Sequence, residues 1–513
     1  MTADGLLTLG RWTTDRAIAT PRRIAIDDRG VLVSYAELDA RATALAARLR
    51  AAGYGVGDRI ATLTGNSSDH VVLFFACAKT GAVLVPLSWR LAPREIAFQI
   101  ELADPALLVV EDEFAALAEA ALEERVAPLP LAGFGRQGLE REVPAPVRAD
   151  GALAELREVR DDDPLLLMFT SGTLDRPKGA LLTHANCFWT NLSLSRTAEI
   201  TSRDVVLAFM PQYHVGGWNI QPLLAWWTGA TVVLERTFDA GRALHLIAQR
   251  RITTMMGVPT NYLLLAKHPS FADADLSTLA HAIVGGAPMP EPLLRTWHAR
   301  GVALTQGYGL TEASPNVLCL PDEEARAKVG LAGTPYPHVE VGIVDPVTGE
   351  RIEGPGEGEL VVRGPGVFAG YFRDPEATAL ALRGGWLHTG DLVRRDADGD
   401  HQIIDRIKDI YLSGGESIAP AEVESVLFEH PAVADAAVVG VPDERWGEVG
   451  VAHVVLRPGR ATDEQEILEF CAERMARFKL PKHVVVVAEI PRTAGSKVLR
   501  RVLLERWLAG VRA

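Results

Sequence analysis

The amino-acid sequence predicts an α/β protein with a large N-terminal domain of parallel α/β sheets and a small β subdomain, followed by a small, mobile α+β domain. Three observations support this prediction. Helical and strand-like segments alternate along the first part of the chain, as they do in parallel sheets. From about Gly333, short strands with turn signals replace the helices. Past the charged stretch around Lys408 a shorter series of helices and strands begins. We therefore expect domains at 1–404 and 411–513, joined by the charged residues 405–410 around Lys408.

The N-terminal elements follow from local patterns. Residues 36–53 have the apolar periodicity of an amphipathic helix that ends at Gly53, and the apolar stretch 59–65 follows as a strand. The alternation continues, with predicted helices at 68–81 and 93–103 and predicted strands at 82–87, 106–112, 230–235 and 281–287.

The two smaller units are predicted in the same way. Segment 340–366 consists of short apolar runs separated by Gly and Pro, which indicates a small β subdomain. The C-terminal domain is expected to contain a helix at 421–430, strands at 435–441 and 451–457, a helix at 463–475, a strand at 483–490 and a last amphipathic helix.

The composition is that of a globular protein. Of 513 residues, 48% are hydrophobic, which is ample for large cores. The net charge of −14 argues against a nucleic-acid surface, and four cysteines without C-x-x-C pairing disfavour a disulfide framework or a zinc site. Because the N-terminus lacks a signal pattern and no apolar run approaches ~18 residues, we expect a cytoplasmic protein with no integral membrane segment. Small-molecule partners are expected, and a homodimer is left open.

The stretch 168–183, MFTSGTLDRPKGALLT, has the composition of a phosphate-binding loop. An apolar strand leads into a turn whose hydroxyls and backbone N–H groups come from Ser171, Gly172 and Thr173, and Lys178 adds a positive charge. Such donors suit polyphosphate oxygens. The spacing is not that of a Walker A motif, which occurs nowhere in the chain, and a polar surface turn is the alternative.

Four more motifs follow this loop in order. They are QGYGLTEASP at 306–315, GWLHTGDL at 385–392, DRIKDIYLSGGE at 405–416 and PRTAGSK at 491–497. Each is weak alone, but together the five resemble the adenylate-forming family of acyl-CoA synthetases, luciferases and stand-alone adenylation domains. The resemblance spans nearly the whole chain. It implies that a carboxylate attacks the α-phosphate of ATP, and that the acyl adenylate then passes its acyl group to a thiol.

The resemblance also implies roles around the phosphates. The loop from Thr170 to Gly179 would hold the β- and γ-phosphates, and Glu312, aided by Thr170, would bind Mg²⁺. Thr311 would hydrogen-bond the α-phosphate. Lys497 would reach the α-phosphate and the substrate carboxylate, a point-charge role that suits an ammonium group. Cations are needed because an anionic nucleophile approaches a polyanion.

Adenosine recognition is implied for other residues. The Tyr308 ring would lie against adenine, and the backbone of Gly286 and Ala287 would line the base. Asp391 would accept hydrogen bonds from both ribose hydroxyls, with Arg406 adding a ribose or phosphate contact. For Asp391, a turn carboxylate that caps a local amide is the alternative.

The second step is implied to use a thiol tunnel. Rotation about Lys408 would present Lys497 first and then the tunnel, whose wall is formed by Gly414 and Gly415. Coenzyme A is the expected thiol, because enzymes that load carrier proteins tend to carry an extra insertion; a carrier-protein ligase is the alternative.

The phosphate loop departs from the family pattern at two positions. Leu174 and Asp175 stand where a second hydroxyl and a glycine are usual. One phosphate contact is therefore missing, and we expect Asp175 to face solvent at the loop tip.

The acyl pocket is expected to be mostly apolar and to accept a hydrophobic monocarboxylate rather than acetate or an amino acid. Medium-to-long fatty acids are placed first and hydroxycinnamate- or benzoate-like acids second. Trp218 would cap a ring or close off a chain, and Asn316 would bond a ring hydroxyl or face water. His214 is a candidate catalytic residue, with a structural histidine as the alternative. The predicted lining residues are His214, Val215, Gly216, Trp218, Gly307, Gly309, Pro315 and Asn316.

Other functions lack their signatures. G-x-G-x-x-G, expected of a nicotinamide enzyme, is absent from the chain. A non-catalytic binding protein of this fold would be expected to lack Glu312 or Lys497, and both are present.

Overall fold

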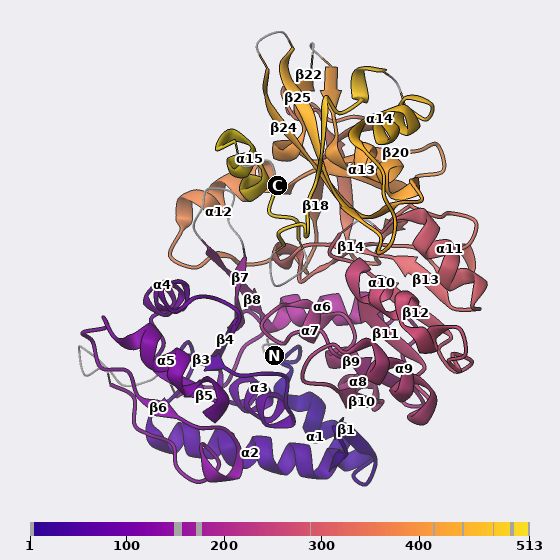
Figure 1. Cartoon of the computed structure of the whole chain (residues 1–513). Coiled ribbons are helices and arrows are strands. Elements are labelled where there is room, and N and C mark those ends of the chain that lie inside the picture. Colours follow the sequence, from indigo (N-terminus) through magenta and orange to yellow (C-terminus); the bar gives the residue numbers. More distant parts are fainter. Residues whose placement is uncertain are drawn as a thin grey trace.

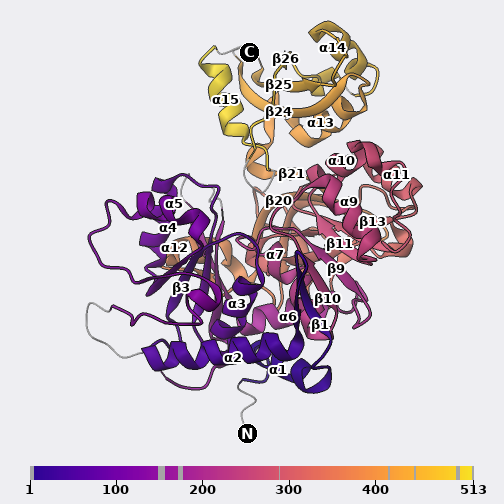
Figure 2. The ribbon, with the colours of Figure 1, turned by 60° about the horizontal axis from the view of Figure 1, so that its bottom comes forward.

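Two seven-stranded sheets form the body of the N-terminal part (Figures 1 and 2). The computed structural model describes residues 5–147, 156–170, 177–287, 289–413, 416–443, 446–475, 477–492 and 497–510. In the first sheet all neighbours are parallel except β1 and β2, which form an antiparallel pair. Its order is β13 (Ala303–Gln306), β12 (His281–Val284), β11 (Thr254–Gly257), β9 (Val205–Ala208), β10 (Thr231–Leu234), β1 (Ile24–Asp28) and β2 (Val31–Ser34).

The second sheet holds the strands that flank the phosphate loop. Its order is β19 (Gly370–Tyr371), β8 (Lys178–Thr183), β7 (Pro164–Thr170), β4 (Val83–Leu87), β3 (Arg59–Leu63), β5 (Leu107–Val110) and β6 (Leu131–Ala132). β7 and β8 are antiparallel, and so are β8 and β19. The expected parallel sheets are thus mixed, because the chain returns directly through β8 rather than through a crossover helix.

Helix positions follow the local signals. α2 (Tyr35–Ala52) begins where the Ser34 side chain accepts a hydrogen bond from the backbone N–H of Glu37, and it ends at Gly53, whose φ is 101°. α3 (Ser68–Thr80) and α4 (Pro93–Ala103) lie where they were predicted. The other helices of the body are α1 (Gly10–Ala19), α5 (Ala115–Leu122), α6 (His184–Leu194), α7 (Gly216–Asn219), α8 (Pro222–Thr228), α9 (Ala240–Gln249), α10 (Pro259–Lys267) and α11 (Glu291–Ala299).

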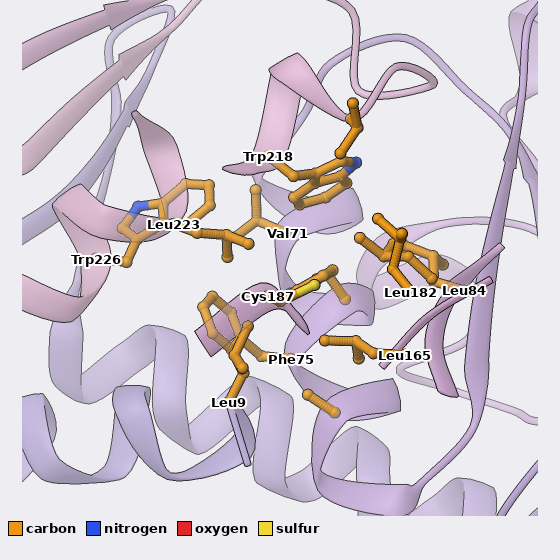
Figure 3. Close-up of a cluster of buried hydrophobic side chains, with 14 of the residues drawn as sticks. Leu9, Val71, Phe75, Leu84, Leu165, Leu182, Cys187, Trp218, Leu223 and Trp226 are labelled. Atoms are coloured by element: carbon orange, nitrogen blue, oxygen red, sulfur yellow. The ribbon is translucent and has the colours of Figure 1, made fainter. Parts of the chain in front are cut away.

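The N-terminal core surrounds α3. Nearly every residue of this helix is buried, which explains its continuous apolar run VVLFFACA. Val71 and Phe75 of α3 pack among Leu223 and Trp226 of α8, and Leu84 and Leu165 belong to the same cluster (Figure 3). This cluster therefore joins the two sheets into one body.

The predicted β subdomain consists of small antiparallel sheets. Four strands form one of them: β17 (Glu340–Val344), β18 (Gly356–Arg363), β20 (Leu387–Arg395) and β21 (His401–Arg406). Three short strands form the other: β14 (Tyr308–Gly309), β15 (Asn316–Cys319) and β16 (Thr334–Pro335). The short helix α12 (Pro375–Ala381) follows β19.

The C-terminal sheet stands above the N-terminal body and is connected to it near β21 (Figure 2). A 3₁₀ turn, η7 (Ile407–Asp409), follows β21, and Lys408 within it is exposed. The hinge role of Lys408 and the boundary at 404 stay predictions. The elements are β22 (Tyr411–Ser413), β23 (Glu416–Ile418), α13 (Pro420–Glu429), β24 (Val433–Asp443), β25 (Gly447–Leu456), α14 (Glu464–Ala472), β26 (His483–Val486) and α15 (Arg500–Leu508).

Within the described ranges, no helix has both the length and the apolar character that crossing a bilayer requires.

Candidate active site

A buried carboxylate, Asp391 on β20, lies at the centre of the predicted nucleotide site. Its side chain accepts a hydrogen bond of 2.5 Å from the Tyr308 hydroxyl at Oδ2. Its Oδ1 lies 3.0 Å from Nε of Arg406. Burial raises the pKa of Asp391, whereas the positive charges of Arg406 and Lys497 and the Tyr308 hydrogen bond lower it. Three of the predicted motifs therefore meet at one carboxylate.

Strand pairing explains this meeting. In the antiparallel register of β20 and β21, Asp391 is the direct partner of Arg406, so their side chains lie across from one another. The backbone before Asp391 is held as well. Thr389 donates its hydroxyl to Leu360 O at 2.7 Å and accepts the backbone N–H of Asp391 at 3.1 Å.

The second cluster is built around Glu312 on the 3₁₀ turn η4 (Thr311–Ala313). Its Oε1 accepts a 2.8 Å hydrogen bond from the Tyr371 hydroxyl. Lys178 at the start of β8 places its ammonium 4.9 Å from the centre of the Tyr371 ring. Burial raises the pKa of Tyr371, and the charge of Glu312 raises it further, so the phenol stays a donor. Tyr371 was not predicted, and it links the metal candidate to the phosphate loop.

Lys497 lies close enough to interact with Asp391 and Arg406. The pKa of Lys497 is lowered to about 8, chiefly by burial and also by the positive charges of Arg406 and Lys408, whereas Asp409 and Asp391 act to raise it. The residues that follow Lys497 are anchored to the C-terminal domain. Val498 bridges to Arg492, and Arg500 Nη2 donates to Glu424 at 2.7 Å. The C-terminal sheet therefore presents Lys497 to the N-terminal site.

The donor set fits a magnesium ion that takes most of its ligands from phosphates and water. Glu312 offers one carboxylate, and η4 packs against β8, which follows the strand that ends in Thr170. In the described part of the chain, no group of three His, Cys, Asp or Glu residues could hold a metal alone. Mg²⁺ in nucleotide sites commonly uses one or two carboxylates plus substrate oxygens, so this sparse set is compatible with it.

Other predicted nucleotide residues occupy neighbouring positions. Thr311 is half-buried beside Glu312. Gly286 and Ala287 follow β12, and the next described residue, Met289, donates its N–H to Gln306 Oε1 at 2.9 Å. Gln306, a second residue not predicted, therefore ties this loop to the strand that leads to Tyr308. Several predicted residues lie outside the described ones and stay predictions: Ser171, Gly172, Thr173, Leu174, Asp175, Gly414 and Gly415.

A small cavity lies beside Gly307 and was only partly predicted. It measures about 20 Å³, room for roughly one water molecule. Alternation along β12 and β13 could have suggested some of its wall, because His281 and Ile283 share one strand face. The lining residues are Thr197, Ala198, His281, Ile283, Thr305, Gly307, Cys319, Leu320, Asp322 and Tyr336.

Trp218 is a correction. We expected it to line the acyl pocket, but its side chain is completely buried in the core. It stacks on Phe74 at 4.7 Å between ring centres, and its Nε1 donates to Gln212 O at 2.6 Å (Figure 3 shows its place in the cluster). With no accessible surface, Trp218 lines no cavity in this structure.

Asn316 does not face water as one of the two alternatives expected, and its contact with a ring hydroxyl stays a prediction. It is 7% exposed and donates its Nδ2 to Thr190 Oγ1 at 3.2 Å, so it does not face water. Pro315 is buried next to it, and the Pro315 carbonyl oxygen would lie 1.7 Å from a Cβ at Gly309. Gly309 is therefore needed for this close backbone approach rather than for substrate space.

His214 is half-buried on the loop before α7, next to Val215 and Gly216. Burial lowers the pKa of His214 to about 4, helped by the positive charge of Arg90, so the ring is neutral at pH 7. Its Nε2 has no hydrogen-bond partner among the described residues. A catalytic role for His214 stays a prediction.

Comparison with known proteins decides the family. The AMP-binding enzyme family matches residues 14–372, and the AMP-binding enzyme C-terminal domain matches residues 422–497. The chain belongs to the AMP-binding enzyme family. It is an AMP-forming acid–thiol ligase of the adenylate-forming superfamily, as the five motifs predicted.

Related ligases cover the whole length of this AMP-binding enzyme. A feruloyl-CoA synthase of Amycolatopsis sp is 40% identical over 97% of this chain and 99% of its own. An indoleacetate–CoA ligase of Aromatoleum aromaticum is 38% identical, with 96% of each chain covered. A long-chain-fatty-acid–CoA ligase of Mycobacterium tuberculosis is 35% identical over 98% of this chain and 99% of its own. The crystal structure of ATP-bound MatB from Rhodopseudomonas palustris superposes with a TM-score of 0.88 at 32% identity, covering 98% and 99%.

The Tyr371 hydroxyl provides a first test of the site. Tyr371→Phe removes the donor that holds Glu312, so we expect the Mg²⁺ concentration needed for half-maximal ATP–pyrophosphate exchange to rise about 10-fold or more. Tyr35→Phe is the matched control, because it removes a buried hydroxyl that donates to Ala230 O, in the N-terminal core. An unchanged Mg²⁺ curve for Tyr371→Phe would show that Glu312 does not depend on this bond.

The ammonium of Lys497 provides a second test. With a pKa of about 8, Lys497 is protonated at neutral pH and loses its charge as pH rises. We expect kcat/KM for ATP in pyrophosphate exchange to fall above about pH 8, which gives a basic limb in the pH profile. In the profile of kcat this limb should lie at higher pH, because bound phosphates favour the charged form of Lys497. Lys497→Arg should abolish this limb, since a guanidinium stays charged. A limb that persists in the Arg variant would assign it to another group.

Proposed function

We propose that this enzyme activates an aryl-substituted carboxylic acid of the hydroxycinnamate type. Its reaction is that of an acyl-CoA synthetase: ATP and the acid give an acyl adenylate and pyrophosphate, and coenzyme A then gives acyl-CoA and AMP. The identity of the acid is the proposal made here. It is proposed from the cavity beside Gly307, and the family roles of the site residues are proposed with it.

In the first step a carboxylate oxygen attacks the α-phosphorus and pyrophosphate leaves. Lys497 would face the carboxylate and the α-phosphate, and its proximity to Asp391 supports this role. Thr311 would donate to the α-phosphate, and Lys178 would reach the outer phosphates. Mg²⁺, held by Glu312 with Thr170, would neutralise phosphate charge.

The ribose would bind at Asp391. Both of its oxygens already have protein partners, Tyr308 and Arg406, yet each carboxylate oxygen can accept a second hydrogen bond. Tyr308 would present its ring to adenine while its hydroxyl stays on Asp391. In the second step the coenzyme A sulfur attacks the acyl carbonyl carbon and AMP leaves; the tunnel wall at Gly414 and Gly415 and rotation about Lys408 are carried over from the family.

The lining of the cavity favours an aryl acid. Half of the ten lining residues are polar: Thr197, His281, Thr305, Asp322 and Tyr336. A tunnel for a long alkyl chain is expected to be apolar, because each polar wall group would lose hydration without a partner. The second candidate is a medium-to-long fatty acid, which the fatty-acid-ligase relative supports.

A pyrophosphate-release screen tests this proposal. We expect turnover in the order hydroxycinnamates, then benzoates, with saturated fatty acids and amino acids far behind, and transfer to coenzyme A for the preferred acid. Gly307→Ala is the matched variant: a Cβ there would meet Ile283 Cγ2 at 3.5 Å, an ordinary contact, so the fold should hold while the cavity narrows. KM for the acid should rise and KM for ATP should stay. Best turnover with fatty acids would contradict the assignment.

A further inference from the structure

We propose that His281 and Asp322 form a subsite that binds a neutral hydrogen-bond donor, such as a phenolic hydroxyl, at the distal end of the acid. This inference rests on the proposed aryl-acid function, and it adds the residues that recognise the substituent on the ring. His281 Nδ1 lies 3.2 Å from Asp322 Oδ2 at one end of the cavity.

The sheet places His281 at the end of the cavity that is far from the predicted nucleotide site. β12 and β13 are parallel, with His281 opposite Ala303 and Ile283 opposite Thr305. Alternation then puts His281, Ile283, Thr305 and Gly307 along one face, and all four line the cavity. Gly307 precedes Tyr308 at the nucleotide end. Ala303, the partner of His281, lies four residues before Gly307, so His281 and Gly307 are about 13 Å apart along the strand direction. An acid with its carboxylate at the nucleotide end would therefore point its far end toward His281.

The hydrogen bonds decide what His281 can bind. An ionised carboxylate only accepts, so contact with Asp322 places the ring proton on Nδ1. We assign the neutral form of the ring, in which Nε2 carries a lone pair. Nε2 is buried and has no hydrogen-bond partner within the described residues. A lone pair held in this way accepts from O–H or N–H, and a phenol or an aryl N–H satisfies it.

The charges around the pair decide what it rejects. Asp322 interacts with two further acidic residues, Glu323 and Glu199. The side chain of Asp322 is 44% exposed and that of His281 only 16%, so Asp322 is the member of the pair nearer to solvent. A substrate with a second carboxylate would approach several negative charges there. The subsite should therefore exclude a distal carboxylate while accepting a hydroxyl.

The test compares three acids that differ only at ring position 4: 4-hydroxycinnamate, cinnamate and 4-carboxycinnamate. For the unmodified enzyme, kcat/KM in pyrophosphate release should favour 4-hydroxycinnamate over cinnamate by at least about 10-fold, with the diacid poorest. His281→Phe keeps a ring and removes the acceptor, so this preference should disappear. His281→Gln, which restores an acceptor on a side chain of similar reach, should recover part of it. Asp322→Asn should relax the exclusion of the diacid.

Ratios of kcat/KM are used because a general loss of activity cancels in them, and KM for ATP and the thermal midpoint serve as controls for folding. Good turnover of all three acids with the same ratios in His281→Phe would overturn the subsite and leave the proposed function standing. No turnover of any aryl acid, with turnover of fatty acids, would overturn both.

Discussion

Asp391 is a carboxylate that is only 4% exposed, and much of the site is arranged around the charge it brings inside. A buried charge is costly unless it is paired and hydrogen-bonded. Here Tyr308 and Arg406 supply the two direct contacts, and the ammonium of Lys497 contributes from the C-terminal side. Three stretches far apart in the sequence are therefore held at one point. Ribose and phosphate need cations and donors of the same kind, so the groups that compensate Asp391 are those of the predicted nucleotide site.

The cluster around Glu312, the predicted magnesium ligand, depends on the same physical constraint. A carboxylate that binds Mg²⁺ must be held in one orientation. It must not be paired with a protein cation, because that pairing would neutralise the charge that attracts the metal. A neutral phenol meets this requirement, since the Tyr371 hydroxyl holds one oxygen and leaves the other available. Lys178 stays over the ring of Tyr371 at 4.9 Å instead of pairing with Glu312 in this structure. The cation thus remains beside the loop that is expected to hold phosphates.

Local sequence signals predicted most helices and strands. The site was predicted less completely, because it depends on contacts between residues far apart in the sequence. The ends of α2 could be read from Gly53 and the apolar period, because helix termination is a local matter. The bond between Tyr371 and Glu312 spans 59 positions and depends on β19 pairing with β8, which no local pattern specifies. The prediction that Trp218 lines the acyl pocket was wrong for a related reason. An aromatic residue near a site packs equally well into a core or a pocket wall, and the contact of Trp218 with Phe74 places it in the core. Family motifs named the charged residues, whereas the far end of the cavity lies outside every motif.

The central claim is that Lys497 supplies charge where the carboxylate meets the α-phosphate, and it can be tested by separating the two half-reactions. Lys497→Ala should lower ATP–pyrophosphate exchange by about 100-fold or more, whereas conversion of a supplied acyl adenylate to acyl-CoA should stay close to that of the unmodified enzyme. Lys482→Ala is the matched control, because it removes a C-terminal lysine that pairs with Asp443. If both half-reactions fell equally in Lys497→Ala while Lys482→Ala was unaffected, the role assigned to Lys497 would be wrong.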